Sequence, residues 1–344
     1  MKICFIGHQN HKSTLSNLFF LDILEKDAIV DRHYFDETNY WEVNKLYNSD
    51  YDLVVCYQYD FMAFSFIARG YPTVVVPMYD GSEHHSSSHW DLLGGSRIVN
   101  FSYNLHIRAK RSGVDDIYVK YFPNPALYHQ VDYSQRKAFF WQRRPNHLDW
   151  RTVKNIILGD QLDAFHLHAP SDDRLLSGIV PSSREQKRFN ITVSTWFEDQ
   201  KEMNSLIDQY NIYIAPRATE GIGMAFLEAM ARGMLVIVND KPTHNEYVSN
   251  WVNGVLYDMS NPCFVNLGRM QELGQRARET CFLGYEKWIN SIDTLRDFIY
   301  STPKPRAISN KVMLSLYDSL PRCFFERGLY NQRVQLIQKI KKVL

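Results

Sequence analysis

Short apolar runs alternate with amphipathic stretches along most of this chain, and this alternation limits the possible folds strongly. Runs of Val, Ile, Phe and Tyr that are apolar throughout are typical of parallel strands covered by helices on both faces. We therefore expect an α/β protein. The expected strands are residues 2–6, 52–57, 73–77, 97–101 and 117–122 in a first series, and 138–141, 164–168, 190–194, 211–215, 234–238 and 254–257 in a second, with helices near 152–158, 199–209 and 223–232.

Two prolines and a polar stretch over residues 123–137 separate the two series and predict a domain boundary. We expect an N-terminal Rossmann-like domain over 1–124, a second one over 125–300, and a helical tail over 301–344. The last segment of the tail predicts an amphipathic helix with an apolar face. That face could pack on the protein body or rest on a membrane surface. Its apolar residues are Val334, Ile337, Ile340 and Leu344.

The composition excludes several classes of protein. With 39 Lys+Arg against 38 Asp+Glu, the net charge is +1, which argues against nucleic-acid binding through bulk charge. The five cysteines form no CxxC pair, so free thiols in a reducing compartment are expected. No apolar stretch approaches the roughly 18 residues that span a bilayer, and no signal segment stands at the N-terminus. These features favour a cytoplasmic protein, or one held peripherally at the inner face of the membrane.

The run TEGIGMAFLEAMARG, residues 219–233, joins a glycine-containing turn to a helix-forming stretch and holds two glutamates, Glu220 and Glu228. A turn that leads into a helix N-terminus presents backbone N–H groups and a positive dipole end, which together suit a phosphate group. Glu228 lies about two helical turns further on, where a carboxylate could accept hydrogen bonds from sugar hydroxyls. A nucleotide-sugar carries both a diphosphate and a polyol.

Three ordered stretches carry a resemblance to a known family. EGIGMAFLEAMARG resembles the signature of glycosyltransferase family 4, whose members are retaining, nucleotide-sugar-dependent enzymes of the GT-B fold. MLVIVNDKPTHNEYVSNWVNGVLYD and NFSYNLHIRAKRSGVDDIYVKYFPNPALY resemble its strand-and-loop region and its interdomain stretch. The resemblance covers about residues 72–257. It implies two Rossmann-like domains that face a central cleft, with the first on the acceptor side and the second binding the donor.

By this resemblance, Glu228 would bind the donor ribose and Glu220 would contact the transferred sugar as a catalytic residue. The backbone that lines the sugar and the diphosphate would be that of Gly221, Ile222, Gly223, Met224 and Ala225. Small residues let the main chain approach a ligand closely.

The leaving diphosphate calls for positive charge, and the family places an Arg and then a Lys after the first strand of the second domain. Arg143 and Arg144 stand at the arginine position, but Asp149 occupies the place of the lysine. Arg151 or Lys154 could substitute for it. Two arginines can hold phosphate oxygens bidentately.

In the first domain the family often has a His before an Asp, whereas this chain has Tyr79 before Asp80. Asp80 is expected at the active site and Tyr79 on the acceptor side. His84 is a further acceptor-side candidate, and His85 and His89 lie in the same loop. The spacing of these histidines is typical of metal ligands, but no carboxylate or cysteine set nearby completes a shell, so no metal site is expected.

Two further positions are expected near the donor. Gly7 follows the first strand and would permit a close turn there. Phe197, beside Trp196, follows a strand of the second domain and would line the nucleotide base pocket, with burial in the core as the alternative.

We therefore expect an enzyme that moves a sugar from a nucleoside diphosphate donor, UDP being commoner than GDP, to a hydroxyl of a glycan or lipid-linked acceptor, with retention. By the resemblance no cofactor and no metal are required, and synthesis of a cell-surface polysaccharide would be typical. Two alternatives stay open. One is a catalytically silent nucleotide-sugar-binding or assembly subunit, and the other is an epimerase of the same fold.

Overall fold

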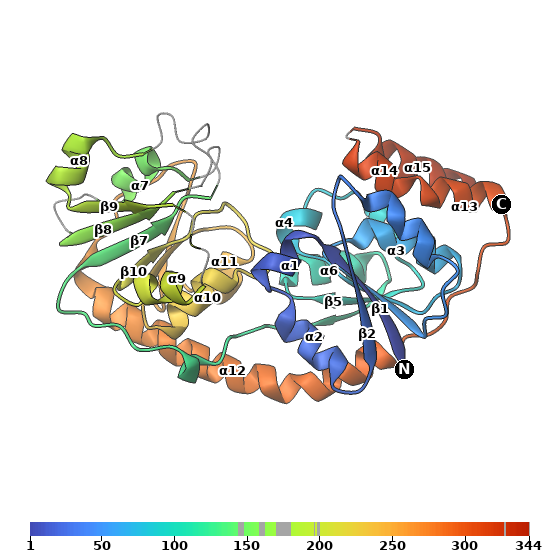
Figure 1. The fold of residues 1–344 in the computed structure, drawn as a ribbon, viewed down its shortest axis with the longest axis horizontal. Helices are drawn as coiled ribbons and strands as arrows, with labels where there is room; N and C mark the ends of the chain where they lie inside the picture. Colours follow the sequence, from blue (N-terminus) through green and yellow to red (C-terminus); the bar gives the residue numbers. More distant parts are fainter. Residues whose placement is uncertain are drawn as a thin grey trace. The chain divides into compact units, whose positions relative to one another are not determined.

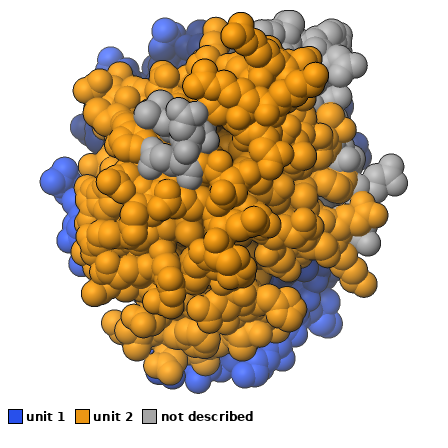
Figure 2. All heavy atoms as spheres, turned by 90° about the vertical axis from the view of Figure 1, so that its left-hand side faces the viewer, with its two compact units in different colours: residues 1–120, 290–344 blue, residues 121–289 orange. Residues whose placement is uncertain are grey.

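The structure is a computed structural model. It describes residues 1–143, 148–157, 162–169, 180–195, 197, 200–326 and 328–343. The chain forms two compact units: unit 1 contains residues 1–120 and 290–344, and unit 2 contains residues 121–289 (Figure 2). The division after residue 120 lies four residues before the boundary expected from sequence. Segment 301–344, expected as a separate tail, belongs to unit 1.

Unit 1 is built on a parallel sheet of six described strands in the order β2-β1-β3-β4-β5-β6. Helices flank this sheet (Figure 1). The strands are β1 Lys2–His8, β2 Ile29–Phe35, β3 Leu53–Tyr57, β4 Thr73–Val76, β5 Arg97–Asn100 and β6 Asp115–Tyr118. The helices before the crossing into unit 2 are α1 Asn10–Thr14, α2 Leu18–Glu25, the 3₁₀ helix η1 Tyr40–Leu46, α3 Asp60–Ala68, α4 Tyr79–Ser82, α5 Ser87–Leu92 and α6 Tyr103–Arg111.

Three C-terminal helices complete the core of unit 1: α13 Lys311–Asp318, α14 Leu320–Phe325 and α15 Tyr330–Lys341. Helices α13 and α14 contact α3 (Figure 1). Helix α15 contacts α5. Val334 and Ile337 of α15 are fully buried in the same apolar cluster as residues of β1, β3 and α3, and Ile340 packs against that cluster. The apolar face expected on this helix is thus occupied by unit 1, although Leu344 lies outside the described residues.

Unit 2 repeats the arrangement, with described strands in the order β12-β11-β10-β7-β8-β9, all parallel. The strands are β7 Lys137–Trp141, β8 Ala164–His168, β9 Ile191–Ser194, β10 Ile212–Ile214, β11 Leu235–Asn239 and β12 Val255–Tyr257. The helices are η2 Pro125–Leu127, α7 Trp150–Ile156, α8 Ser183–Arg188, α9 Gln200–Ile207, α10 Met224–Ala231, α11 His244–Tyr247 and η5 Leu267–Arg269. Helix α12, Met270–Tyr300, begins in unit 2 and ends in unit 1.

Every strand expected from the sequence overlaps an observed one, but β2 was missed. Its sequence IVDRHYF carries Asp31 and Arg32 in mid-strand, which breaks the apolar pattern. The strand lies at the edge of the sheet, where charged residues are usual. No helix in the described part of the chain combines the length and the apolar content that a bilayer span needs.

Candidate functional site

The candidate site lies in unit 2 where the order of the strands reverses. The chain runs outward from β7 to β8 and β9, then returns to the other side of β7 to form β10, β11 and β12. Strands β7 and β10 are paired in parallel, with Phe140 opposite Ile214, so their following loops leave the sheet side by side. Ligands of open α/β sheets bind at such a reversal, outside the carboxyl ends of the strands. The two loops carry Arg143 and the glycine-containing run.

The β10–α10 loop, residues 215–223, has a backbone that only glycine accommodates at its end. Gly223 is the N-cap of α10 and has φ +86°, in the left-handed region. A Cβ added there would lie 1.9 Å from Cε1 of the buried Phe226 ring. Two side chains hold the loop in place: Thr243 Oγ1 donates to the Ile222 carbonyl at 3.1 Å, and Asn239 Nδ2 donates to the Ala218 carbonyl at 2.8 Å. The loop is therefore fixed at the start of α10.

The start of α10 offers N–H groups without intrahelical acceptors. Met224 and Ala225 form its first turn and are partly exposed, whereas Gly221, Ile222 and Gly223 are buried. From the sequence, these five residues are expected to present their backbone to a ligand. Residues 221–223 lie in the loop and Met224 and Ala225 in the first turn of α10, and their contact with a ligand stays a prediction.

Glu220 is held by an ion pair inside the same loop. Arg217 Nη1 donates to Glu220 Oε2 at 3.0 Å, and the Glu220 side chain is only 12% exposed. The backbone N–H of Glu220 donates to the Pro242 carbonyl at 3.3 Å, which ties the loop to the segment after β11. Arg217 was not among the site residues expected from the sequence. Its position three residues before the glutamate in a short loop was the available signal.

Glu228 lies on α10 at the edge of the same region. Its side chain is 26% exposed, yet burial raises the pKa of its carboxyl, while Arg232 and Arg143 act in the opposite direction. Arg232 Nη1 lies 3.9 Å from Glu228 Oε2, too far for a hydrogen bond, and Arg232 Nε donates to Asp208 at 2.7 Å. In the part of the chain that the structure describes, no donor lies within hydrogen-bond distance of this carboxylate, so it can accept hydrogen bonds from a ligand. Arg232 was also missed, although its i,i+4 spacing from Glu228 was a readable signal.

Of the cations expected to bind phosphate, Arg143 is the one best placed. It follows β7, is exposed, and its guanidinium lies 4.0 Å from the centre of the Trp141 ring. Its charge acts on Glu228 and on His168, whose pKa burial lowers to about 4. Arg144 lies outside the described residues.

The other candidate cations are engaged elsewhere. Asp149, at the position of the family's lysine, caps α7 by accepting from the Thr152 N–H at 3.1 Å. Arg151 Nη2 donates to Asp149 at 2.8 Å, and Lys154 Nζ lies 3.2 Å from Glu185. The aspartate therefore has a structural role at the helix start, and the substitution of Lys154 for the missing lysine is not favoured by this geometry.

Phe197 lies against the carboxyl end of strand β8. Its ring stacks on His168 at the end of β8, with ring centroids 5.2 Å apart and planes at 23°. Phe197 is half-buried at the carboxyl edge of the sheet, which suits a flat ligand such as a nucleotide base. Trp196 lies outside the described residues.

In unit 1, the structure departs from the sequence-based predictions more than it does in unit 2. Gly7 is part of β1, which continues to His8, so the turn expected there is wrong. Its missing side chain instead leaves room for the rings of Phe5 and Tyr34, which would lie 3.3 and 3.4 Å from an added Cβ. Asp80 is half-buried in the short helix α4, and Tyr79 beside it is buried.

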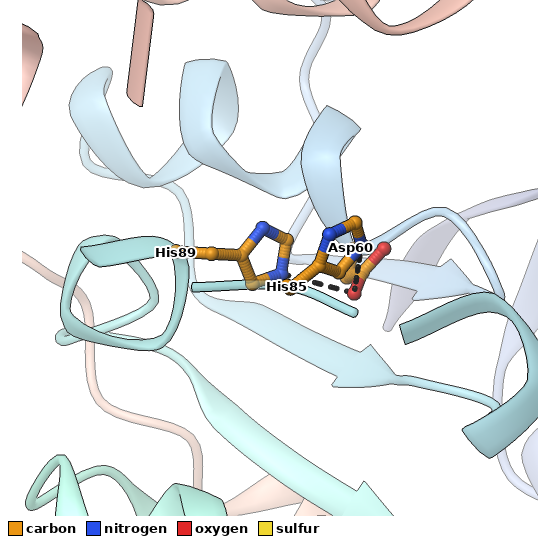
Figure 3. Close-up of side chains that lie close together, drawn as sticks. All are labelled: Asp60, His85 and His89. Carbon is orange, nitrogen blue, oxygen red and sulfur yellow. Dashed lines mark hydrogen bonds and ion pairs between the residues drawn. The ribbon is translucent and has the colours of Figure 1, made fainter. Parts of the chain in front are cut away.

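The three histidines that follow α4 differ in their exposure to solvent. The side chain of His84 is 90% exposed, whereas His85 and His89 turn inward to Asp60 at the start of α3 (Figure 3). No carboxylate that could complete a metal shell with these histidines was expected from the sequence. The fold supplies Asp60, 25 residues before His85 in the chain, with one ligand atom from each residue within 4.8 Å of the others.

A family model matches part of unit 2. Residues 186–263, which contain the β10–α10 loop, Glu220 and Glu228, match the family model described as "Glycosyl transferases group 1". Comparison with curated protein sequences finds no match.

Solved structures share the fold at low sequence identity. HepE (Alr3699) of Anabaena in complex with UDP is 14% identical, with a TM-score of 0.62 over 88% of this chain and 100% of that one. Sucrose-phosphate synthase of Thermosynechococcus elongatus is 12% identical, with a TM-score of 0.62 over 86% and 98%. The lipopolysaccharide outer core galactosyltransferase WaaB in its apo form is 15% identical, with a TM-score of 0.50 over 88% and 96%. The fold of two six-stranded Rossmann-like units, together with the group 1 segment in unit 2, identifies the chain as a glycosyltransferase of the GT-B fold.

Proposed function

We propose that this protein is a retaining glycosyltransferase of the family 4 type, which transfers a sugar from a UDP-sugar to a hydroxyl of a glycan or lipid-linked acceptor. The observation that carries the proposal is the β10–α10 loop, where a glycine-capped helix start lies between two acidic side chains. A diphosphate fits the helix start, and sugar hydroxyls fit the two carboxylates. That solved HepE structures contain UDP or UDP-glucose supports UDP as the first donor to test.

The roles of the residues follow from the charge that develops during transfer. Cleavage of the bond between the anomeric carbon and the phosphate oxygen leaves negative charge on the diphosphate and positive charge on the sugar. Arg143 and the N–H groups of the α10 start would stabilise the diphosphate. Glu228 would accept hydrogen bonds from the ribose. Glu220, held by Arg217, would orient the sugar by accepting hydrogen bonds from its hydroxyls.

The acceptor oxygen forms the new bond to the anomeric carbon on the face that the diphosphate leaves, which retains the configuration. The acceptor proton passes to the departing phosphate oxygen, so the reaction needs no separate general base. This scheme uses no metal and no cofactor. The acceptor would be bound by unit 1, where Asp80, Tyr79 and His84 are the candidate residues, and cell-surface polysaccharide synthesis is the proposed setting.

One experiment tests the donor assignment. Binding of UDP and GDP is measured by calorimetry for the wild type, for Glu228→Ala, and for the control Glu279→Ala, which removes an exposed glutamate of α12. Hydrogen bonds to a charged group contribute about 1.5–3 kcal/mol, so Glu228→Ala should weaken nucleotide binding by roughly 10- to 150-fold. Unchanged affinity in Glu228→Ala would remove the ribose role. A screen of nucleotide-sugars for released diphosphate then identifies the sugar, and tight binding without turnover would favour the silent subunit.

A further inference from the structure

Unit 1 contains a buried polar cluster that the transfer reaction does not use: Asp60, His85 and His89, called here the Asp–His–His cluster (Figure 3). Asp60 begins α3, His85 precedes α5, and His89 lies within α5. The side chains of Asp60, His85 and His89 are 3%, 9% and 0% exposed. His89 Nε2 lies 3.0 Å from Asp60 Oδ2, and His85 Nε2 lies 3.6 Å from the same oxygen.

The buried carboxylate lacks a permanent positive partner. In the described part of the chain, the groups that form ion pairs with Asp60 are the two histidines, and no Lys or Arg does so. Ser82 Oγ donates to Asp60 Oδ2 at 2.9 Å, which helps but brings no charge. A buried carboxylate is costly unless it is paired with positive charge or coordinates a metal. The positive charge must therefore come from a proton on an imidazole or from a bound cation.

A proton accounts for only part of the cluster. A protonated His89 would donate through Nε2 to Asp60 and through Nδ1 to the hydroxyl of Tyr330 on α15, 2.6 Å away. It would leave His85 Nε2 buried and facing the same carboxylate oxygen, with no hydrogen-bond partner among the described residues. Buried polar atoms in proteins are nearly always paired. A cation, unlike a proton, would engage all three side chains at once.

The surroundings of the cluster match those of a metal site. Two imidazoles and a carboxylate are a common ligand set for Zn²⁺, which leaves a fourth position for water. A histidine that ligates a metal usually donates its other N–H to a fixed acceptor, and the Tyr330 hydroxyl is placed to accept from His89 Nδ1.

The two imidazole rings are stacked, with centroids 3.9 Å apart and planes at 18°. Nitrogen lone pairs lie in the ring plane, so two nearly parallel rings do not point at one ion. Ligation therefore requires one ring to turn. His85 is the one able to do so, because its Nε2 makes no hydrogen bond, whereas both nitrogens of His89 are engaged.

We propose that Asp60, His85 and His89 bind one Zn²⁺ ion, which joins the start of α3 to α5 and, through Tyr330, to α15. The ion neutralises the buried carboxylate and takes the unpartnered His85 nitrogen as its third ligand. Neutral His89 carries its proton on Nδ1 in this state and donates it to the Tyr330 hydroxyl. This role is structural, and it is independent of the sugar transfer proposed for unit 2.

The test uses tag-free, full-length protein, and its readout is bound metal. Protein treated with chelator is dialysed against Zn²⁺ and then against metal-free buffer, and zinc is counted by mass spectrometry. The wild type should retain about one Zn²⁺ per chain. His85→Gln should bind at least tenfold more weakly, and the control His84→Gln, which changes the exposed neighbour, should bind like the wild type. His85 is the position to change because it makes no hydrogen bond through Nε2, so the variant is expected to fold.

Thermal unfolding gives a second readout. Chelator should lower the melting temperature of the wild type and of His84→Gln but not that of His85→Gln. Two results would overturn the proposal: wild-type protein that retains no zinc after loading, or zinc that is retained equally by His85→Gln. The first would assign the cluster to a proton shared by Asp60, His89 and Tyr330, and the second would place the metal elsewhere on the chain.

Discussion

Replacing Gly223 by alanine tests the shape of the β10–α10 loop. The left-handed backbone at φ +86° costs an ordinary L-residue about 1–2 kcal/mol. The new Cβ would also lie 1.9 Å from Cε1 and 2.5 Å from Cδ1 of Phe226. That ring is 1% exposed and packs against His244 and Tyr247, so it has little room to move. Overpacking of this kind costs about 1–3 kcal/mol, and together the two effects predict a loss of about 2–5 kcal/mol.

The comparison with Gly113→Ala separates these two effects. Gly113 has φ +68°, but an added Cβ there would meet no atom within 4 Å. It should therefore lose only the backbone contribution, about 1–2 kcal/mol. The assay is denaturant unfolding of each variant, with UDP binding measured alongside. We expect Gly223→Ala to weaken UDP binding at least tenfold, because the turn that presents the helix start must shift.

A double variant gives the decisive result. If the clash with the ring dominates, Phe226→Leu should relieve it, and the combined loss in Gly223→Ala/Phe226→Leu should be smaller than the two single losses added together. The reasoning is refuted if Gly223→Ala loses no more stability than Gly113→Ala, or if the two losses in the double variant simply add.

Three further predictions concern single charges and contacts. Burial raises the pKa of Glu228 in the folded state above its ordinary value of 4.5, so ionisation of this carboxyl opposes folding. The stability of the wild type should therefore fall relative to that of Glu228→Gln as the pH rises from 4.5 through the raised pKa. Denaturant unfolding across that pH range checks this, and parallel curves would contradict it. Arg143→Ala should weaken UDP binding, measured by calorimetry, by about tenfold or more. Arg151→Ala should leave UDP binding unchanged, because the Arg151 guanidinium is paired with Asp149. Equal effects of the two variants would remove the phosphate role of Arg143. Ile337→Asp should destabilise unit 1 by more than about 3 kcal/mol in thermal or denaturant unfolding, because it places a charge in the core. Since the apolar face of α15 is covered by unit 1, the wild-type protein should not co-sediment with vesicles through this helix. Co-sedimentation that Ile337→Asp abolishes without loss of stability would refute this.

The β10–α10 region was readable from sequence because its determinants are local. The glycines, the helix formers and the two glutamates stand within 15 residues, so their spacing alone fixes a strand, a turn and a helix. The roles of Glu220 and Glu228 remain predictions, but the position of Glu220 in the loop before the helix and of Glu228 on the helix follows directly from that spacing.

The Asp–His–His cluster could not be predicted in the same way. His85 and His89 are visible as a pair, but Asp60 stands in a different helix and reaches them only through the packing of α3 against the sheet. The position of Asp149 was equally ambiguous, since an aspartate before a helix can bind a ligand or cap the helix. In the structure Asp149 caps the helix, because its Oδ1 accepts a hydrogen bond from the Thr152 N–H.

The tail presented a choice that local pattern could not resolve. An amphipathic helix has the same period whether its apolar face meets a protein core or a lipid surface. Val334 and Ile337 lie in an apolar cluster with residues of α3 and β3. This packing, which the local sequence pattern does not contain, shows that protein covers the apolar face.

The return of the chain to unit 1 after residue 289 has a consequence for biosynthesis. All of unit 2 leaves the ribosome before α13, α14 and α15 are made, so unit 2 can fold as a nascent chain while unit 1 still lacks part of its interior. Until these three helices emerge, the surfaces of α3 and α5 that they will cover stay open to solvent. We therefore expect the first 120 residues to be the last to reach their final stability, and premature termination within the final 40 residues or so to leave a sound unit 2 attached to an aggregation-prone unit 1.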